Sequence, residues 1–150
     1  MSKKFTLQPL LDLAQDKLDD AAKALQTAKA EWQQAEQQLA QLQQFKLEYQ
    51  QRLLESQRHG MSIGAVRDFQ RFLHKLDTAI EQQYKYITHC QRQWEARQQD
   101  WMNARKELKA YDTLATRHQR QEEQRQAKRD QKILDEFAIK RFWANRHANS

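Results

Sequence analysis

The chain has 150 residues, of which 31% are charged and 39% are hydrophobic, and its mean hydropathy is −1.11. This composition supplies too little apolar material for a large globular core, and two glycines and one proline allow few turns. It fits a single domain of long helices that expose most of their surface to water. Intrinsic disorder is the alternative for so polar a chain, and it remains open for the two ends.

The net charge of +6 is unevenly distributed along the sequence. Residues 1–60 carry no net charge, residues 61–115 carry +2 and residues 116–150 carry +4. The C-terminal part therefore favours acidic partners, whether protein, nucleic acid or lipid headgroup. The single Cys90 excludes an internal disulfide, and no apolar run reaches membrane-spanning length, so we expect a soluble protein of a reducing cytosol.

A heptad repeat begins at Leu11 and ends at Leu53. Its steps alternate between three and four residues, and Lys46 departs from the apolar pattern. A repeat of about 3.5 residues keeps one side of a helix against a partner helix, so this stretch predicts a coiled coil. The repeat consists of Leu11, Ala14, Leu18, Ala21, Leu25, Ala28, Trp32, Ala35, Leu39, Leu42, Tyr49 and Leu53.

A second heptad repeat follows, and it consists of Phe69, Leu73, Leu76, Ile80, Gln83, Ile87, Cys90, Trp94, Arg97, Trp101, Ala104, Leu108, Tyr111, Ala115 and His118. Between the repeats, Gly60 suits the left-handed residue after a helix end, and Ser62 suits the cap of the next helix. If the chain reverses here, residues whose numbers total about 120 face one another. The alanines of the first helix then lie opposite bulky residues of the second, and Cys90 is a buried thiol.

These patterns predict an all-α fold, a long antiparallel two-stranded coiled-coil hairpin with an overhanging C-terminal helix or tail. Thr6 or Gln8 is expected to cap the first helix, with Pro9 in its first turn. We expect a single coiled-coil domain over residues 1–150, with a helix at about 7–57, a hinge at about 58–64, a helix at about 65–118 and a tail or helix extension at 119–150.

The tail ends in a short apolar patch that has no partner within the predicted hairpin. Ile133, Leu134, Phe137 and Ala138 are followed by Phe142 and Trp143. Because apolar residues without an internal partner usually have an external one, a partner-binding helix and a frayed tail are both open.

One face near the hinge is left over once the two repeats are paired. Leu42, Phe45 and Tyr49 of the first helix face Ala79, Leu76 and Phe72 of the second, and Gln38 lies beside Gln83. Two helices cannot bury both phenylalanines in addition to their heptad positions. The face therefore predicts a docking surface, with a core that broadens under the hinge as the alternative.

The sequence contains no motif for catalysis or metal binding. The five histidines have no partner at ligand spacing, and two glycines cannot supply a glycine-rich phosphate loop. We therefore expect no enzymatic activity, no metal and no cofactor. Nucleic acid is not an expected partner, because the aromatic residues are not interleaved with the basic residues of the tail.

Three blocks of the sequence occur in order, with the hinge glycine between the first and the second. They are Leu11-Asp12-Leu13-Ala14 with Leu18-Asp19-Asp20-Ala21-Ala22, then Phe69-Gln70-Arg71-Phe72-Leu73 with Leu76 and Ala79-Ile80-Glu81-Gln82, and finally Asp130-Gln131-Lys132 with Leu134-Asp135-Glu136-Phe137-Ala138. By these blocks the chain resembles the flagellar export protein FliJ family over almost its whole length.

The resemblance implies a non-enzymatic, cytoplasmic component of the bacterial flagellar type III export apparatus, peripheral to the cytoplasmic side of the inner membrane. Such a protein looks like the central stalk, or gamma, subunit of rotary ATPases. It would bind the FliI-type export ATPase hexamer and promote assembly of its ring, contact the cytoplasmic domain of the FlhA-type export gate protein, and help recycle export chaperones. It would thereby serve flagellum biogenesis, motility and chemotaxis.

Two sets of site residues are implied by the resemblance. The export-gate docking face would consist of Gln38, Leu42, Phe45, Tyr49, Phe72, Leu76, Ala79 and Gln83, with Phe45 where tyrosine is expected and Gln83 where histidine can occur. The ATPase-ring end would consist of Leu10, Leu11, Leu13, Ile133, Leu134, Asp135, Glu136, Phe137 and Phe142.

Two alternatives remain at the level of the sequence. The stalk protein of a virulence type III secretion system shares the architecture, although the Asp135-Glu136-Phe137-Ala138 block favours the flagellar branch. A generic coiled-coil scaffold that binds protein or nucleic acid is an alternative of a different class.

Overall fold

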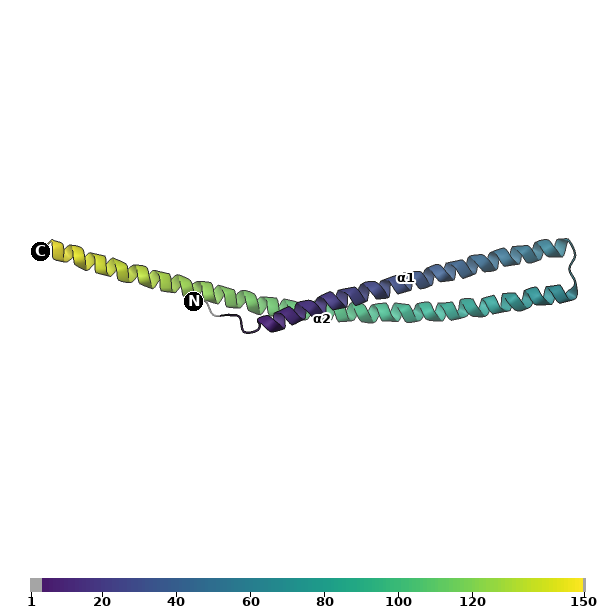
Figure 1. Cartoon of the computed structure of the whole chain (residues 1–150), viewed down its shortest axis with the longest axis horizontal. Helices are drawn as coiled ribbons and strands as arrows, with labels where there is room; N and C mark the ends of the chain where they lie inside the picture. Colours follow the sequence, from purple (N-terminus) through teal and green to yellow (C-terminus); the bar gives the residue numbers. More distant parts are fainter. Residues whose placement is uncertain (1–3, 150) are drawn as a thin grey trace. The chain divides into compact units, whose positions relative to one another are not determined.

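A computed structural model describes residues 4–149 of the chain. Two helices, α1 (Gln8–Arg58) and α2 (Ile63–Ala148), account for nearly all of these residues. The two helices are antiparallel and lie side by side next to the turn that joins them (Figure 1). The predicted all-α helical hairpin is therefore confirmed. Where the sequence left the tail open between a helix and a disordered end, α2 continues as one helix to Ala148.

Contacts divide the chain into two compact units. The hairpin unit is Asp19–Asn103, and the terminal unit combines Met1–Leu18 with Ala104–Ser150. Each unit contains a segment of α1 and a segment of α2. The hairpin unit holds the turn between the helices and the predicted gate face, whereas the terminal unit holds all the residues of the predicted ATPase-ring end.

The turn between the helices has the chemistry that its sequence predicts. Gly60 has a left-handed backbone, with φ of 91°. The Ser62 hydroxyl accepts a hydrogen bond of 3.1 Å from the amide of Ala65, and the Ser62 carbonyl accepts one from Val66, so Ser62 caps α2. The linker is shorter than the predicted hinge, because Ile63 and Gly64 already belong to α2.

The start of α1 differs in detail from the expectation that Thr6 or Gln8 caps it. The Gln8 side chain donates forward to Asp12 at 2.9 Å, and the Leu7 carbonyl accepts the first hydrogen bond of the helix from Leu11. Pro9 lies in the first turn, where its missing N–H would have no partner in the helix.

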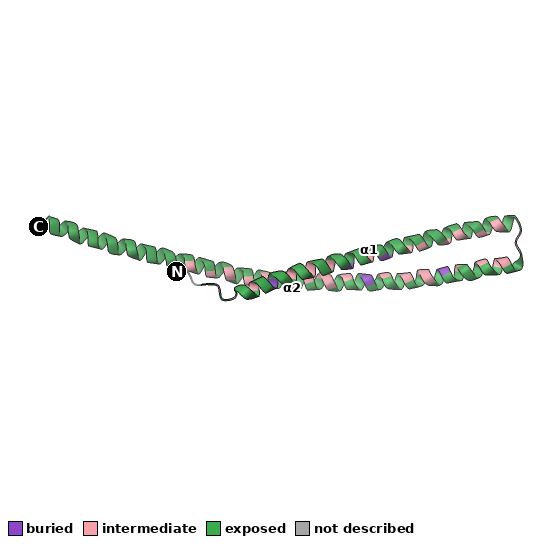
Figure 2. Cartoon of the chain, in the orientation of Figure 1, coloured by how far each residue is buried: buried purple, intermediate pink, exposed green. Residues whose placement is uncertain are grey.

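The heptad positions of the hairpin unit are withdrawn from water (Figure 2). Ala28, Ala35, Leu76 and Cys90 are buried, and the other predicted heptad residues of this unit are half-buried. Two helices cannot surround a bulky side chain, which explains why mainly small residues reach full burial. The buried thiol predicted for Cys90 is confirmed.

The tryptophans of the hairpin unit pair more closely than the simple register predicts. The rings of Trp32 and Trp94 lie 5.4 Å apart, although the register places Trp94 opposite Leu25. Helical side chains lean toward the N-terminus of their own helix. In this antiparallel pair Trp32 lies nearer the turn than Trp94, so the two side chains lean toward each other and meet.

In the terminal unit, the first turns of α1 pack against α2. Ala14 is buried, the rings of Phe5 and His118 lie 5.5 Å apart, and Lys17 and Glu107 form an exposed ion pair at 3.6 Å. Such exposed pairs contribute little, and apolar packing therefore dominates here.

The residues from 123 to 149 are all exposed, and we call their helical part, residues 123–148, the bare helix (Figure 2). Its surface carries side-chain pairs one turn apart, including Gln126 with Asp130 at 3.1 Å and Gln131 with Asp135 at 3.0 Å. Each pair of this kind stabilises a helix by about 0.2–0.5 kcal/mol, which is small beside tertiary packing. Within residues 4–149, neither helix contains an apolar stretch that would cross a membrane.

Candidate functional site

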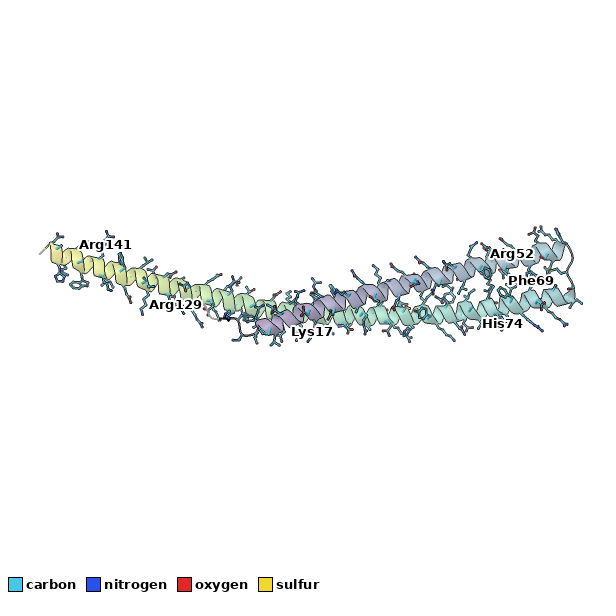
Figure 3. All side chains as sticks on the ribbon, in the orientation of Figure 1. Lys17, Arg52, Phe69, His74, Arg129 and Arg141 are labelled. Carbon is cyan, nitrogen blue, oxygen red and sulfur yellow. The ribbon has the colours of Figure 1, made fainter. Side chains whose placement is uncertain are left out.

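Four aromatic side chains gather between and beside the helices near the turn, and we call them the aromatic patch (Phe45, Tyr49, Phe69 and Phe72). The ring of Tyr49 lies 4.5 Å from Phe72 and 4.8 Å from Phe69, and the ring of Phe45 lies edge-on to Phe72 at 6.0 Å. In Figure 3, Phe69 is on the side of α2 that faces α1. Each ring pair contributes roughly 0.5–1.5 kcal/mol beyond its buried area.

The aromatic patch is only partly covered. Phe45 is 43% exposed and Phe72 is 36% exposed, whereas Tyr49 and Phe69 are half-buried. Tyr49, which itself packs against Phe69, therefore supports the two exposed phenylalanines. This arrangement holds two large apolar side chains at the surface with their ring positions fixed, which is what an interface anchor requires.

The remaining apolar residues of the predicted gate face have different exposures. Leu42 and Ala79 are half-buried beside the aromatic patch, but Leu76 is only 7% exposed. Leu76 thus packs between the helices, as its heptad position predicts, and its side chain offers little surface to a partner.

The polar end of the predicted gate face is held by Gln83. Its amide donates to the Ala35 carbonyl at 2.8 Å and to the Gln38 side chain at 3.3 Å, which fixes Gln83 across the helix pair. A hollow of about 520 Å³ lies next to this amide bridge, lined by Gln38, Gln41, Leu42, Phe45 and Gln83. Gln41 was missed by the sequence reasoning because it lies outside the heptad and outside the apolar pattern.

The other side of the helix pair is closed by polar contacts. Lys46, the residue that breaks the heptad, is half-buried and forms an ion pair with Asp77. The Gln43 side chain donates to the Tyr84 hydroxyl at 2.9 Å. The two sides of the hairpin unit therefore differ, and the aromatic patch belongs to the side that lacks the ion pair.

The predicted ATPase-ring end occupies two separate places in the terminal unit. Leu10 and Leu13 are 42% and 49% exposed near the start of α1, with Leu11 half-buried between them. Ile133, Leu134, Phe137 and Phe142 are exposed on the bare helix, as are the carboxylates Asp135 and Glu136. At 1.5 Å per residue, the fifteen-residue step from His118, which contacts Phe5, to Ile133 spans about 22 Å, so the two groups do not form one surface.

The apolar residues of the bare helix surround it. At 100° per residue, Leu134 and Trp143 lie on opposite sides of the helix, and Ile139 lies about 160° from Phe137. Ile139 and Trp143, 57% and 50% exposed, were not among the predicted site residues. The rings of Phe142 and Trp143 lie 6.1 Å apart, and Arg146 lies over the Trp143 ring at 5.7 Å.

Ionisable side chains form no metal site within residues 4–149, since no three His, Cys, Asp or Glu side chains gather there around one point. Tyr86 is the residue whose acidity is altered most clearly. A hydrogen bond with the Cys90 thiol raises the pKa of the Tyr86 hydroxyl above its ordinary value. This contact belongs to the hairpin unit and includes no residue of the aromatic patch.

Comparisons with known proteins agree on one family. The family model described as "Flagellar FliJ protein" matches residues 2–147. A curated relative, the flagellar FliJ protein of Salmonella typhi, is 31% identical over 138 residues, which cover 92% of this chain and 94% of that protein.

Proposed function

The chain belongs to the FliJ family of flagellar proteins, and we propose that it is a non-enzymatic component of the flagellar type III export apparatus that acts by binding. Its partners in this proposal are the hexameric export ATPase, the cytoplasmic domain of the export gate protein and export chaperones. It works on the cytoplasmic side of the inner membrane, which it approaches through these partners.

The observation that carries the proposal is the bare helix. Large apolar side chains that are 50–63% exposed project from opposite sides of a helix that has no partner within the described chain. Apolar side chains that point to several sides of one helix suit an enclosing partner better than one flat surface. The opening of an ATPase ring is such an environment, so this helix supports an insertion role.

The gate contact is supported by the exposed half of the aromatic patch. Phe45 and Phe72 contact each other and Tyr49 before a partner arrives, so binding would restrict little additional side-chain motion. Gln83 and Gln38 add amide groups at one edge for hydrogen bonds to the partner. Leu76 supports this surface from within and is not itself the contact.

A pull-down experiment with two variants tests both contacts. Deletion of residues 130–150 is expected to weaken binding and stimulation of the export ATPase by at least about tenfold while gate binding persists, because it removes the apolar residues of the bare helix. Phe72→Ala is expected to weaken binding of the gate domain while binding of the export ATPase persists. The lost ring contacts should lower the stability of the hairpin by roughly 1 kcal/mol. Thermal melting checks that both variants retain the folded hairpin.

Each variant is the control for the other. If the deletion left ATPase binding intact, the ring-insertion role would be refuted. An equal loss of binding to the export ATPase and to the gate domain in either variant would mean that the two contacts are not separate.

A further inference from the structure

A basic groove (Arg67, Gln70, Arg71, His74 and Lys75) lies on the outward side of α2 in the hairpin unit. These five side chains, all from α2, line a shallow and open hollow of about 460 Å³ on the helix surface. In Figure 3, His74 is on the side of α2 that faces away from α1. The groove thus lies outside the helix pair, and its residues take no part in the heptad packing.

Three cations form one row along this groove. Arg67, Arg71 and Lys75 are spaced four residues apart, so successive side chains are neighbours on one face, about 6 Å apart along the helix. None of the three forms an ion pair with another described residue. Like charges at this spacing repel one another, and Asp68 beside Arg71 reduces the charge of the row to only +2.

The basic groove adjoins the exposed part of the aromatic patch. Phe72 follows Arg71 directly, and Lys75 lies three residues after Phe72, on the neighbouring strip of the helix surface. A partner that covers Phe72 therefore reaches Lys75 and Arg71 as well. At 100° per residue, Lys75 lies about 60° and Arg71 about 100° around the helix from Phe72, so the row of cations begins directly beside the apolar anchor.

We propose that the basic groove and Phe72 together dock an acidic segment of a partner protein, with an apolar side chain against Phe72 and carboxylates against Arg67, Arg71 and Lys75. Arginine guanidinium groups suit this task because they bind carboxylates through two parallel hydrogen bonds. The inference deepens the proposed gate contact and rests on it for the identity of the protein that carries the segment.

The composition of the groove favours a protein segment over a membrane surface. Polybasic segments that hold anionic lipids carry about four to eight clustered lysines and arginines, whereas this row has three beside a carboxylate. An apolar anchor beside a row of two arginines and a lysine fits a peptide that combines an apolar residue with spaced carboxylates.

The test uses the full chain and a labelled helical peptide with glutamates four residues apart and a phenylalanine on the adjoining face. Fluorescence anisotropy is expected to show salt-sensitive binding that falls by at least about tenfold in the Arg67→Gln, Arg71→Gln, Lys75→Gln triple variant and in Phe72→Ala. The matched control, Lys128→Gln with Arg129→Gln and Lys132→Gln, removes the same charge from the exposed bare helix and is expected to leave the affinity unchanged.

Several outcomes would overturn the proposal. They are an absence of peptide binding, equal losses in the two triple variants, or equal binding of a peptide with glutamine in place of glutamate. Retention on vesicles of anionic lipid, without peptide binding, would assign the groove to a membrane surface instead.

Binding of the gate protein's cytoplasmic domain to the same variants distinguishes failure of the groove proposal from failure of the proposed gate contact. If its cytoplasmic domain binds through Phe72 but ignores the groove variant, the groove proposal fails and the proposed function stands. If the gate domain does not bind while the acidic peptide binds through the groove, the gate contact fails and the groove stands.

Discussion

Two glycines lie four residues apart where the helices join, and their backbones differ. Gly60 has φ of 91°, a conformation that side chains with a Cβ adopt at a cost, whereas Gly64 lies in the first turn of α2. No described atom outside the local chain lies within 4 Å of the place where a Cβ would stand at either position. An added Cβ meets no such atom at either site, so a difference between the two substitutions reports on backbone conformation and not on steric conflict.

Substitution of each glycine by alanine is expected to change stability in opposite directions. Gly60→Ala should destabilise the hairpin by about 1 kcal/mol because of its left-handed backbone, whereas Gly64→Ala should stabilise it by about 0.5 kcal/mol because the unfolded chain loses freedom. Urea unfolding of the full chain measures both. A loss of the same size at both positions would contradict the assignment of strain to Gly60.

Single residues at the junction were well predicted from sequence, because their roles depend on local chemistry. Ser62 caps α2 and Gly60 adopts the left-handed turn, as their residue types indicate. Gln8 was harder to predict, since its side chain has several partners within reach and bonds to Asp12 instead of capping.

At the scale of the helix, the alanines of α1 set how closely α2 approaches. Ala14 and Ala35 are each 1% exposed, and Ala28 is 7% exposed. Ala35 also supplies the carbonyl that Gln83 binds at 2.8 Å, which a wider helix separation would break. A larger side chain at this position therefore affects both the packing and the amide bridge.

Ala35→Leu is expected to destabilise the hairpin by about 1–3 kcal/mol through overpacking. Ala40→Leu is the matched control, because Ala40 is exposed on the same helix and both residue types favour helix. Thermal melting compares the two variants. Equal melting temperatures would show that the helix pair tolerates separation at Ala35.

The heptad pattern predicted which residues of each helix are withdrawn from water, because burial in a helix pair follows a simple period. It could not decide the place of Leu76, which belongs both to the heptad and to the leftover face. The basic groove could not be predicted from this pattern. Arg67, Arg71 and Lys75 are charged and lie outside the heptad positions, so the spacing of apolar residues does not indicate them.

At the scale of the whole molecule, the chain divides into paired helices and a bare helix. The sequence predicted that α2 would lose its partner after His118, and the last half-buried residue is Glu122. The sequence did not predict the separation of Leu10 and Leu13 from the apolar residues of the bare helix. That separation depends on α2 continuing as one helix through residues 119–132. Because these residues are polar, the sequence did not decide between a helix extension and a tail.

Hydrogen exchange on the free chain is expected to be fastest in residues 123–148 and slowest in the heptad positions of the hairpin unit. A helix without tertiary contacts is marginal in water, so its amides open without unfolding the paired helices. Mass spectrometry of the exchanged chain provides the measurement, with and without the export ATPase. Uniform protection along α2 in the free chain would contradict this expectation.

The bare helix also bears on how long the protein persists in a cell. Segments that open easily are the ones that proteases cleave first, and this segment carries large apolar side chains in addition. If the proposed partner encloses the bare helix, a bound copy would be protected from proteases, whereas a surplus copy would be cleaved. The amount of the protein would thus follow the number of available binding places, with no dedicated regulator.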